Sequence, residues 1–180
     1  PKAGYVMEFL SGMIPIKSLA KPRKETNEIY EWYNSTGGLR RRLQLLGRTA
    51  LLLARMHARG LVYSDPSPDN IFVSESPDHS EVWFIDTDNI RSVDTPGNGV
   101  HTPGYGAPEL VSGKSPVSPY SDGYAFMVIA FEVLVLHHPF IGDQVEDGPP
   151  EMEEKAFSGQ FPWIDCEDDT SNATERLGMP

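Results

Sequence analysis

The chain has 180 residues, 39% of them apolar and 23% charged, which is typical of one soluble globular domain with its own core. A single cysteine, Cys166, excludes an internal disulfide framework and favours a reducing compartment, so we expect a cytoplasmic protein. The net charge of −11 makes the chain a poor general binder of nucleic acid, and we expect no direct nucleic-acid binding.

The charge is unevenly placed along the chain. Residues 1–60 hold eleven Lys or Arg against four Asp or Glu, whereas residues 61–180 hold four against twenty-two. The basic run at residues 40–42 has two interpretations, a solvated helix end or a contact for an acidic partner, and we favour the first. The chain begins at Pro1 and ends without a clear stopping element, so we expect both ends to be cut from something longer.

The first predicted elements are a strand and two helices. The apolar run at residues 4–10 predicts a strand leading into a Ser-Gly turn, and a short helix is expected at about residues 26–33. The clearest helix covers about residues 39–58, with Gly60 as its stop. Its apolar side chains recur at spacings of three and four, and the opposite face is rich in arginine; the apolar positions are Leu39, Leu43, Leu46, Ala50 and Leu53.

Short β segments and a second long helix follow. The β-like runs at residues 70–73 and 82–86 flank a Ser/Pro/Asp turn and predict a hairpin, after a shorter run at 61–63. A Gly/Pro-rich loop comes next, of a length that is usually functional or disordered. A buried helix is expected near residues 122–136; it is too short to span a bilayer, so we expect no membrane partner. The remainder is acidic, and we expect parts of it to be mobile.

The polar residues between these elements occur in a distinctive order. They are "YSDPSPDN" at residues 63–70, "DTD" at 86–88 and "APE" at 107–109. This order resembles the C-terminal lobe of the protein kinase family, whose catalytic loop is H-R-D-L-x-x-x-N, whose metal loop is D-F-G and whose activation segment ends in A-P-E. The resemblance extends to "YVMEFLSG" at 5–12, which is similar to the hinge between the lobes, and to "SDGYAFMVIAFEVL" at 121–134, which is similar to the central buried helix.

The resemblance implies a fold and a domain organisation. We expect an α+β fold that is mainly α-helical, a kinase-like C-terminal lobe with short β-hairpins around the catalytic and metal loops and with the N-terminal lobe missing. Residues 1–12 would be the end of the N-lobe strand and the hinge. Residues 13–180 would be the C-terminal lobe, truncated at its C-terminus, with an acidic segment at 141–170. The N-terminal lobe of the parent protein would then be a partner of this chain.

The same resemblance implies roles for site residues. Asp65 and Thr102 are the predicted catalytic pair: Asp65 accepts or orients the hydroxyl to be phosphorylated, and Thr102 hydrogen-bonds Asp65. Asn70 and Asp86 are the predicted ligands of the Mg²⁺ ion that accompanies ATP. A threonine at residue 102 favours a Ser or Thr acceptor in a protein substrate.

Four further residues are expected at the adenine pocket. Met7 takes the gatekeeper position, the backbones of Glu8 and Leu10 pair with adenine, and Phe72 lies against the ring.

Three more expectations are structural. Asp122 would bind the backbone of the catalytic loop, and His57 would support the structure without taking part in catalysis. Glu109 would anchor the activation segment through an arginine, for which Arg176 is the only downstream candidate.

The chain departs from the kinase pattern in the loops themselves. Ser64 and Ser67 replace an arginine and a lysine of the catalytic loop, and Thr87 and Asp88 replace the Phe and Gly of the metal loop. The loop "DPSPDN" with "IDTD" is similar to bacterial kinase-like proteins, some joined to helix-hairpin-helix DNA-binding segments and some associated with PP2C-type phosphatases. That group adds such a phosphatase as an expected partner.

Three functions remain open at this point. The favoured one is a bacterial-type Ser/Thr protein kinase, and the alternatives are a pseudokinase or interaction module and a small-molecule phosphotransferase of kinase fold. The sequence has no Gly-rich phosphate loop, no V-A-I-K lysine and no partnering glutamate helix. We therefore expect the isolated chain not to transfer phosphate.

Overall fold

The computed structural model describes residues 10–21, 28–95, 97 and 99–175. The elements in chain order are β1 Met13–Pro15, α1 Lys17–Ala20, α2 Ile29–Ser35, α3 Gly38–His57, β2 Leu61–Val62, β3 Ile71–Ser74, β4 Val82–Phe84, the 3₁₀ turn Thr87–Asn89, β5 Arg91–Ser92, α4 Pro108–Val111, α5 Pro119–Val135, α6 Asp143–Glu146, α7 Pro150–Phe157 and the 3₁₀ turn Thr170–Asn172. The mixed α/β composition, with helices predominating, agrees with the predicted α+β, mainly helical architecture. None of the helices in the described ranges is long and apolar enough to cross a membrane.

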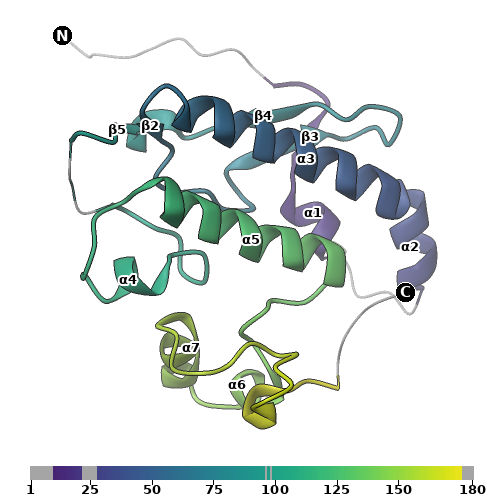
Figure 1. The fold of residues 1–180 in the computed structure, drawn as a ribbon. Coiled ribbons are helices and arrows are strands. Elements are labelled where there is room, and N and C mark those ends of the chain that lie inside the picture. Colours follow the sequence, from purple (N-terminus) through teal and green to yellow (C-terminus); the bar gives the residue numbers. More distant parts are fainter. Residues whose placement is uncertain (1–9, 22–27, 96, 98, 176–180) are drawn as a thin grey trace, which may run out of the picture.

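The two longest helices, α3 and α5, lie side by side at the centre of the molecule (Figure 1). The strands lie along α3, and α6 and α7 lie beyond α5 on the other side. One sheet has the order β1-β3-β4 and the other pairs β2 with β5, all antiparallel. The predicted hairpin is confirmed: β3 and β4 pair with Phe72 opposite Trp83.

The core lies where α1, α3, α5 and β3 meet. Ile16, Leu45, Ile71, Ile129 and Val133 are all completely buried there. Burial of side chains of this kind stabilises the fold by about 1.5–3 kcal/mol each. The hydrophobic cluster therefore holds together elements that carry the polar loops at their ends.

Helix α5 confirms the predicted buried helix and begins a few residues earlier than expected. Ser118 caps its N-terminus in a reciprocal capping box with Ser121, and Pro119 occupies the first turn, where its missing N–H costs nothing. The helix ends at Leu136, which has a left-handed backbone with φ of +61°. Because the N-terminal cap fixes where α5 begins, it also fixes the position of Asp122, which lies one turn into the helix.

Helix α3 is where predicted, but its predicted buried face is wrong in the first half. Leu39 and Leu43 are 53% and 52% exposed, whereas Arg41 and Arg42 are buried. The solvated helix end favoured for residues 40–42 is therefore wrong for these two arginines. The reason is that α1 and α2 pack on this end and supply carbonyl oxygens and an aromatic ring to the guanidinium groups.

Two other predictions meet the limits of the described ranges. The strand expected at residues 4–10 lies outside them except for Leu10, and α2 begins at Ile29, so the expected start near Thr26 lies outside them too.

The acidic stretch that follows α5 contains α6 and α7. Buried Asn172 accepts a hydrogen bond from the N–H of Gly142 at 3.0 Å and donates to the Pro162 carbonyl at 2.8 Å, which fixes this stretch to itself.

Candidate active site

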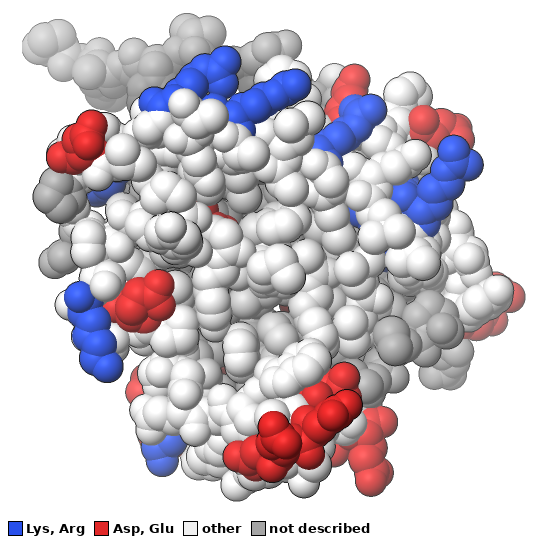
Figure 2. Space-filling model, in the orientation of Figure 1, with Lys and Arg blue, Asp and Glu red and all other residues white. Residues whose placement is uncertain are grey.

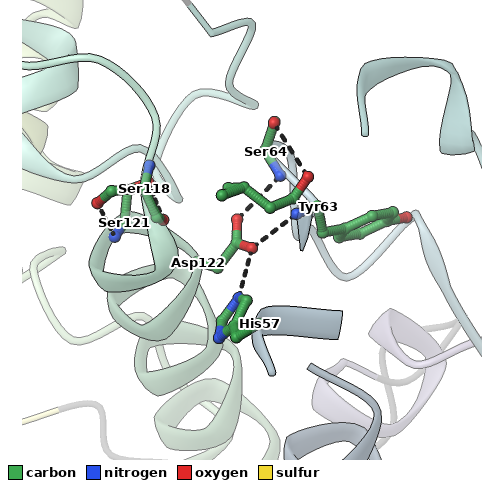
Figure 3. A network of polar contacts seen from close by, with 7 residues as sticks. His57, Tyr63, Ser64, Ser118, Ser121 and Asp122 are labelled. Atoms are coloured by element: carbon green, nitrogen blue, oxygen red, sulfur yellow. Dashed lines mark hydrogen bonds and ion pairs between the residues drawn. The ribbon is translucent and has the colours of Figure 1, made fainter. Parts of the chain in front are cut away.

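Asp122 holds the start of the predicted catalytic loop from below (Figure 3). Its carboxylate is completely buried and accepts hydrogen bonds from the backbone N–H of Tyr63 at 2.8 Å and of Ser64 at 2.9 Å. His57 Nε2 lies 2.9 Å from Oδ2 of the same carboxylate. Burial raises the pKa of Asp122, and the three hydrogen bonds oppose that rise by favouring the charged form. The structural roles expected of Asp122 and His57 agree with these contacts.

Ser64 has a backbone conformation that non-glycine residues rarely adopt. Its φ is +77°, in the left-handed region, where a Cβ carries an energetic cost of order 1 kcal/mol or more. The hydrogen bond from Ser64 N–H to Asp122 offsets this cost by fixing the peptide in place. Ser64 and Ser67 are both buried, at 3% and 1% exposure, so the two serines that replace family cations are enclosed within the loop.

The loop presents Asp65 to the segment that follows residue 100. Asp65 Oδ1 accepts hydrogen bonds from Thr102 N–H at 2.8 Å and from Thr102 Oγ1 at 2.9 Å. Asn70 Nδ2 donates to the Asp65 carbonyl oxygen at 3.2 Å and reaches Oδ2 only at 3.5 Å. The structure thus brings together three of the predicted site residues, Asp65, Thr102 and Asn70. Oδ1 of Asp65 is fixed by two hydrogen bonds, whereas Oδ2 has the longer contact with Asn70.

The hairpin brings Asp86 to the same place. Ile85 N–H donates to the Asn70 carbonyl oxygen at 3.0 Å, and Asp86 follows immediately, exposed and with φ of +52°. Tyr63 stacks on Phe84 with ring centroids 4.8 Å apart and also hydrogen-bonds the Ile85 carbonyl. Burial raises the pKa of Tyr63, and the nearby charges of Asp65, Asp86 and Asp122 raise it further. Tyr63 is therefore under the electrostatic influence of all three carboxylates.

The oxygen atoms of Asn70 and Asp86 suit a hard cation that also keeps water or phosphate oxygens as ligands. Within the described ranges, no group of three His, Cys, Asp or Glu side chains could enclose a metal ion. The amide nitrogen of Asn70 is taken up by Asp65, which leaves its Oδ1 and the Asp86 carboxylate as oxygen donors. Mg²⁺ is usually bound by one or two protein oxygens together with water and substrate phosphates, so these residues fit it.

The remaining predicted site residues are less closely connected. Phe72 lies on β3 beside Pro15 of β1, and half-buried Leu10 precedes that strand. Met7, Glu8 and the proposed anchor Arg176 lie outside the described residues.

Two contacts that the sequence did not predict fix the segment after Thr102. Tyr105 Oη donates to Glu132 Oε2 of α5 at 2.7 Å, and burial raises the pKa of both groups. His138 Nε2 lies 3.1 Å from the Gly104 carbonyl. The signal available in the sequence was the carboxylate of Glu132 within the apolar run at residues 124–136.

Comparison with known proteins agrees with this geometry. The sequence profile of the protein kinase domain matches residues 24–174. Serine/threonine-protein kinase PknA of Mycobacterium tuberculosis is 34% identical over 146 residues, which are 78% of this chain and 30% of PknA.

Two other bacterial proteins are similar over shorter stretches. Serine/threonine-protein kinase PknL of M. tuberculosis is 35% identical over 96 residues, 51% of this chain and 23% of PknL. Serine/threonine-protein kinase pkn2 of Myxococcus xanthus is 34% identical over 110 residues, 57% of this chain and 13% of pkn2. The chain thus spans less than a third of these relatives. With a profile match over most of its length and a loop arrangement of the kind just described, the chain belongs to the protein kinase family.

Proposed function

We propose that this chain is the C-terminal lobe of an ATP-dependent protein kinase that transfers the γ-phosphate of ATP to Ser or Thr of a protein substrate. The observation that carries the proposal is the pair of hydrogen bonds from Thr102 to Asp65. The loop of Asp65 also contains Asn70, whose carbonyl oxygen accepts the N–H of Ile85, the residue before Asp86. Phosphoryl transfer depends on alignment and charge neutralisation more than on covalent help, and this arrangement supplies alignment.

In this proposal Asp65 orients the acceptor hydroxyl through Oδ2, the carboxylate oxygen that accepts no hydrogen bond from Thr102. The hydroxyl oxygen forms a bond to the γ-phosphorus, the bond to the β-phosphate oxygen breaks, ADP leaves and the hydroxyl proton passes to Asp65. Asn70 and Asp86 would hold Mg²⁺, which would neutralise charge on the phosphates. Phe72 and Leu10 would contact adenine, together with Met7 and Glu8.

The lobe assignment is part of the proposal. The sequence contains no Gly-x-Gly-x-x-Gly loop, so we propose that a separate N-terminal lobe covers the nucleotide phosphates and that the chain alone does not transfer phosphate. Titration calorimetry of the chain with Mg·ATP tests whether the nucleotide needs the separate lobe. Binding in the micromolar range would contradict that need.

A pseudokinase is the second candidate, and one observation favours it. Ser67 replaces the family lysine and is 1% exposed, so it supplies no cation at the transferring phosphoryl group. Retention of Asp65, Asn70 and Asp86 together favours the kinase, because a scaffold needs none of the three.

The deciding experiment uses the native-length protein with labelled ATP and Mg²⁺ or Mn²⁺, beside the Asp65→Ala and Asp86→Ala variants. Transfer of label to protein that both substitutions abolish is the result that the proposal predicts. Nucleotide binding without any transfer by the wild type would establish the pseudokinase instead. Transfer to a small molecule but not to protein would indicate the third alternative.

A further inference from the structure

A groove of about 320 Å³ lies between the C-terminal half of α3 and the strands β2 and β4. Its lining includes none of Asp65, Asn70, Asp86 and Thr102. Its lining combines apolar side chains with two arginines: Leu52, Arg55, Met56, Arg59, Leu61, Val82, Trp83 and Phe84.

The floor of the groove is apolar and well fixed. Phe84 lines it and also stacks on Tyr63, so the floor is continuous with the buried packing beneath the catalytic loop. Trp83 stands at the side of the groove and is 47% exposed. An indole that is half exposed beside a cavity offers a large apolar surface with one N–H donor, which is a common anchor in protein interfaces.

The charged residues that line the groove are both basic. Arg55 and Arg59 are exposed, and Arg59 Nη1 donates to the Arg55 carbonyl oxygen at 2.9 Å, which holds its side chain along the helix end. None of the lining residues is acidic, and α3 itself contains no Asp or Glu. Figure 2 shows a row of blue side chains along the edge of the molecule where α3 lies, with a few red ones beside them, and a larger red cluster at the opposite edge.

We propose that this groove binds an acidic peptide segment of a partner protein that carries a bulky apolar side chain. The apolar side chain would fill the cavity against Trp83, and the flanking carboxylates would meet Arg55 and Arg59. Charge complementarity selects the sign of the partner, because a chain with net charge −11 repels polyanions except at such a basic surface. The apolar cavity favours a peptide with an apolar side chain over a nucleic acid, because the affinity of nucleic acids for proteins comes mainly from their phosphates.

The test measures binding by calorimetry and does not depend on phosphate transfer. The probe is a short synthetic peptide of Asp and Glu residues around a pair of leucines, compared with the same peptide carrying serines in place of leucines. The groove variant combines Arg55→Glu with Arg59→Glu. The matched control combines Arg40→Glu with Arg48→Glu, because these arginines are exposed on the same helix but do not line the groove.

We expect the groove variant to bind the leucine peptide at least about tenfold more weakly than the wild type, with the control variant within about threefold. The serine peptide should also bind at least about tenfold more weakly. Trp83→Ser, a change at a half-exposed position, should weaken leucine-peptide binding while leaving the circular dichroism spectrum unchanged.

Four results would overturn the proposal. Equal weakening in the groove and control variants would mean a general attraction between charges. Equal binding of the leucine and serine peptides, or no binding of the leucine peptide to the wild type, would mean that the cavity takes no apolar side chain. Tighter binding of an oligothymidylate at Arg55 and Arg59 would identify a nucleic-acid surface instead.

Discussion

At the scale of single residues, the two oxygens of Asp65 are in different situations. Oδ1 is held by both the N–H and the hydroxyl of Thr102, while the Asn70 amide lies 3.5 Å from Oδ2. A carboxylate held on one side is oriented, and its second oxygen is available to a hydroxyl group. These contacts support our proposal that Thr102 positions Asp65.

The contribution of the Thr102 hydroxyl can be measured directly. Thr102→Val removes one charge-assisted hydrogen bond but keeps the backbone N–H, so kcat of the native-length protein should fall by about ten- to a hundredfold. Thr102→Ser should restore most of the loss, and KM for Mg·ATP should stay unchanged. Steady-state kinetics check this prediction, and a valine variant as active as the wild type would contradict it.

The residues of the candidate site were largely predictable because they form short local motifs. Asp65, Asn70 and Asp86 occur at a spacing that is visible in the sequence alone, and the structure brings them together. The left-handed backbone of Ser64 was not predictable, because it depends on hydrogen bonds to Asp122, which is far away in the chain. The contact between Tyr105 and Glu132 depends in the same way on how α5 packs.

At the scale of elements, α3 shows why periodicity alone misplaces a buried face. Arg42 lies fully buried, donates to the Leu19 carbonyl at 2.9 Å and stacks on the Tyr33 ring at 3.9 Å. Burial lowers its pKa to about 10, which still leaves it charged near neutral pH. A charged side chain is usually assigned to solvent, and only the packing of α1 and α2 reverses that assignment.

Arg42 should therefore contribute to the joining of these three helices. Arg42→Lys keeps the charge but loses the planar donors, so the free energy of unfolding should fall by about 2 kcal/mol or more. Exposed Arg40 is the matched control, and Arg40→Lys should change it by less than about 0.5 kcal/mol. Urea unfolding followed by circular dichroism measures both, and equal effects would contradict the role assigned to Arg42.

A second element-scale feature fastens the segment after Thr102 to the region that follows α5. His138 lies among the rings of Tyr105, Phe140 and Phe157. Its Nε2–H donates to the Gly104 carbonyl, and its Nδ1 accepts the N–H of Phe140. Both ring nitrogens are satisfied in the neutral form. Burial is the main reason that the pKa of His138 is lowered to about 4.

This lowered pKa predicts a pH dependence of stability with a definite sign. Between about pH 6.5 and pH 4, His138 binds a proton in the unfolded chain but not in the folded protein. The contribution of neutral His138 to the free energy of unfolding is therefore fully present above this range and is lost as the pH falls through it. His138→Gln removes the titration. The unfolding free energy of the wild type should therefore fall, relative to that of the variant, by up to about 3 kcal/mol across this range. A difference that stays constant with pH would contradict the assignment.

At the scale of the whole molecule, our proposal makes the chain one side of a phosphoryl-transfer site. The chain orients the Asp65 carboxylate, and it spans less than a third of the relatives that resemble it. The charge of the molecule is also unevenly distributed, with basic side chains along the edge where α3 lies and an acidic excess in residues 61–180. The charge division was visible in the sequence, but the position of the basic edge beside an apolar groove was not, because α3 and β4 are far apart in the chain.

The central claim is that Asp65 handles the acceptor hydroxyl during phosphate transfer. The most direct test is single-turnover transfer of labelled phosphate by the native-length protein and its Asp65→Asn variant, with Mg·ATP binding measured on the same samples. The account predicts a rate lower by at least about a hundredfold with nucleotide affinity essentially unchanged. A variant that transfers phosphate within about tenfold of the wild-type rate would contradict it.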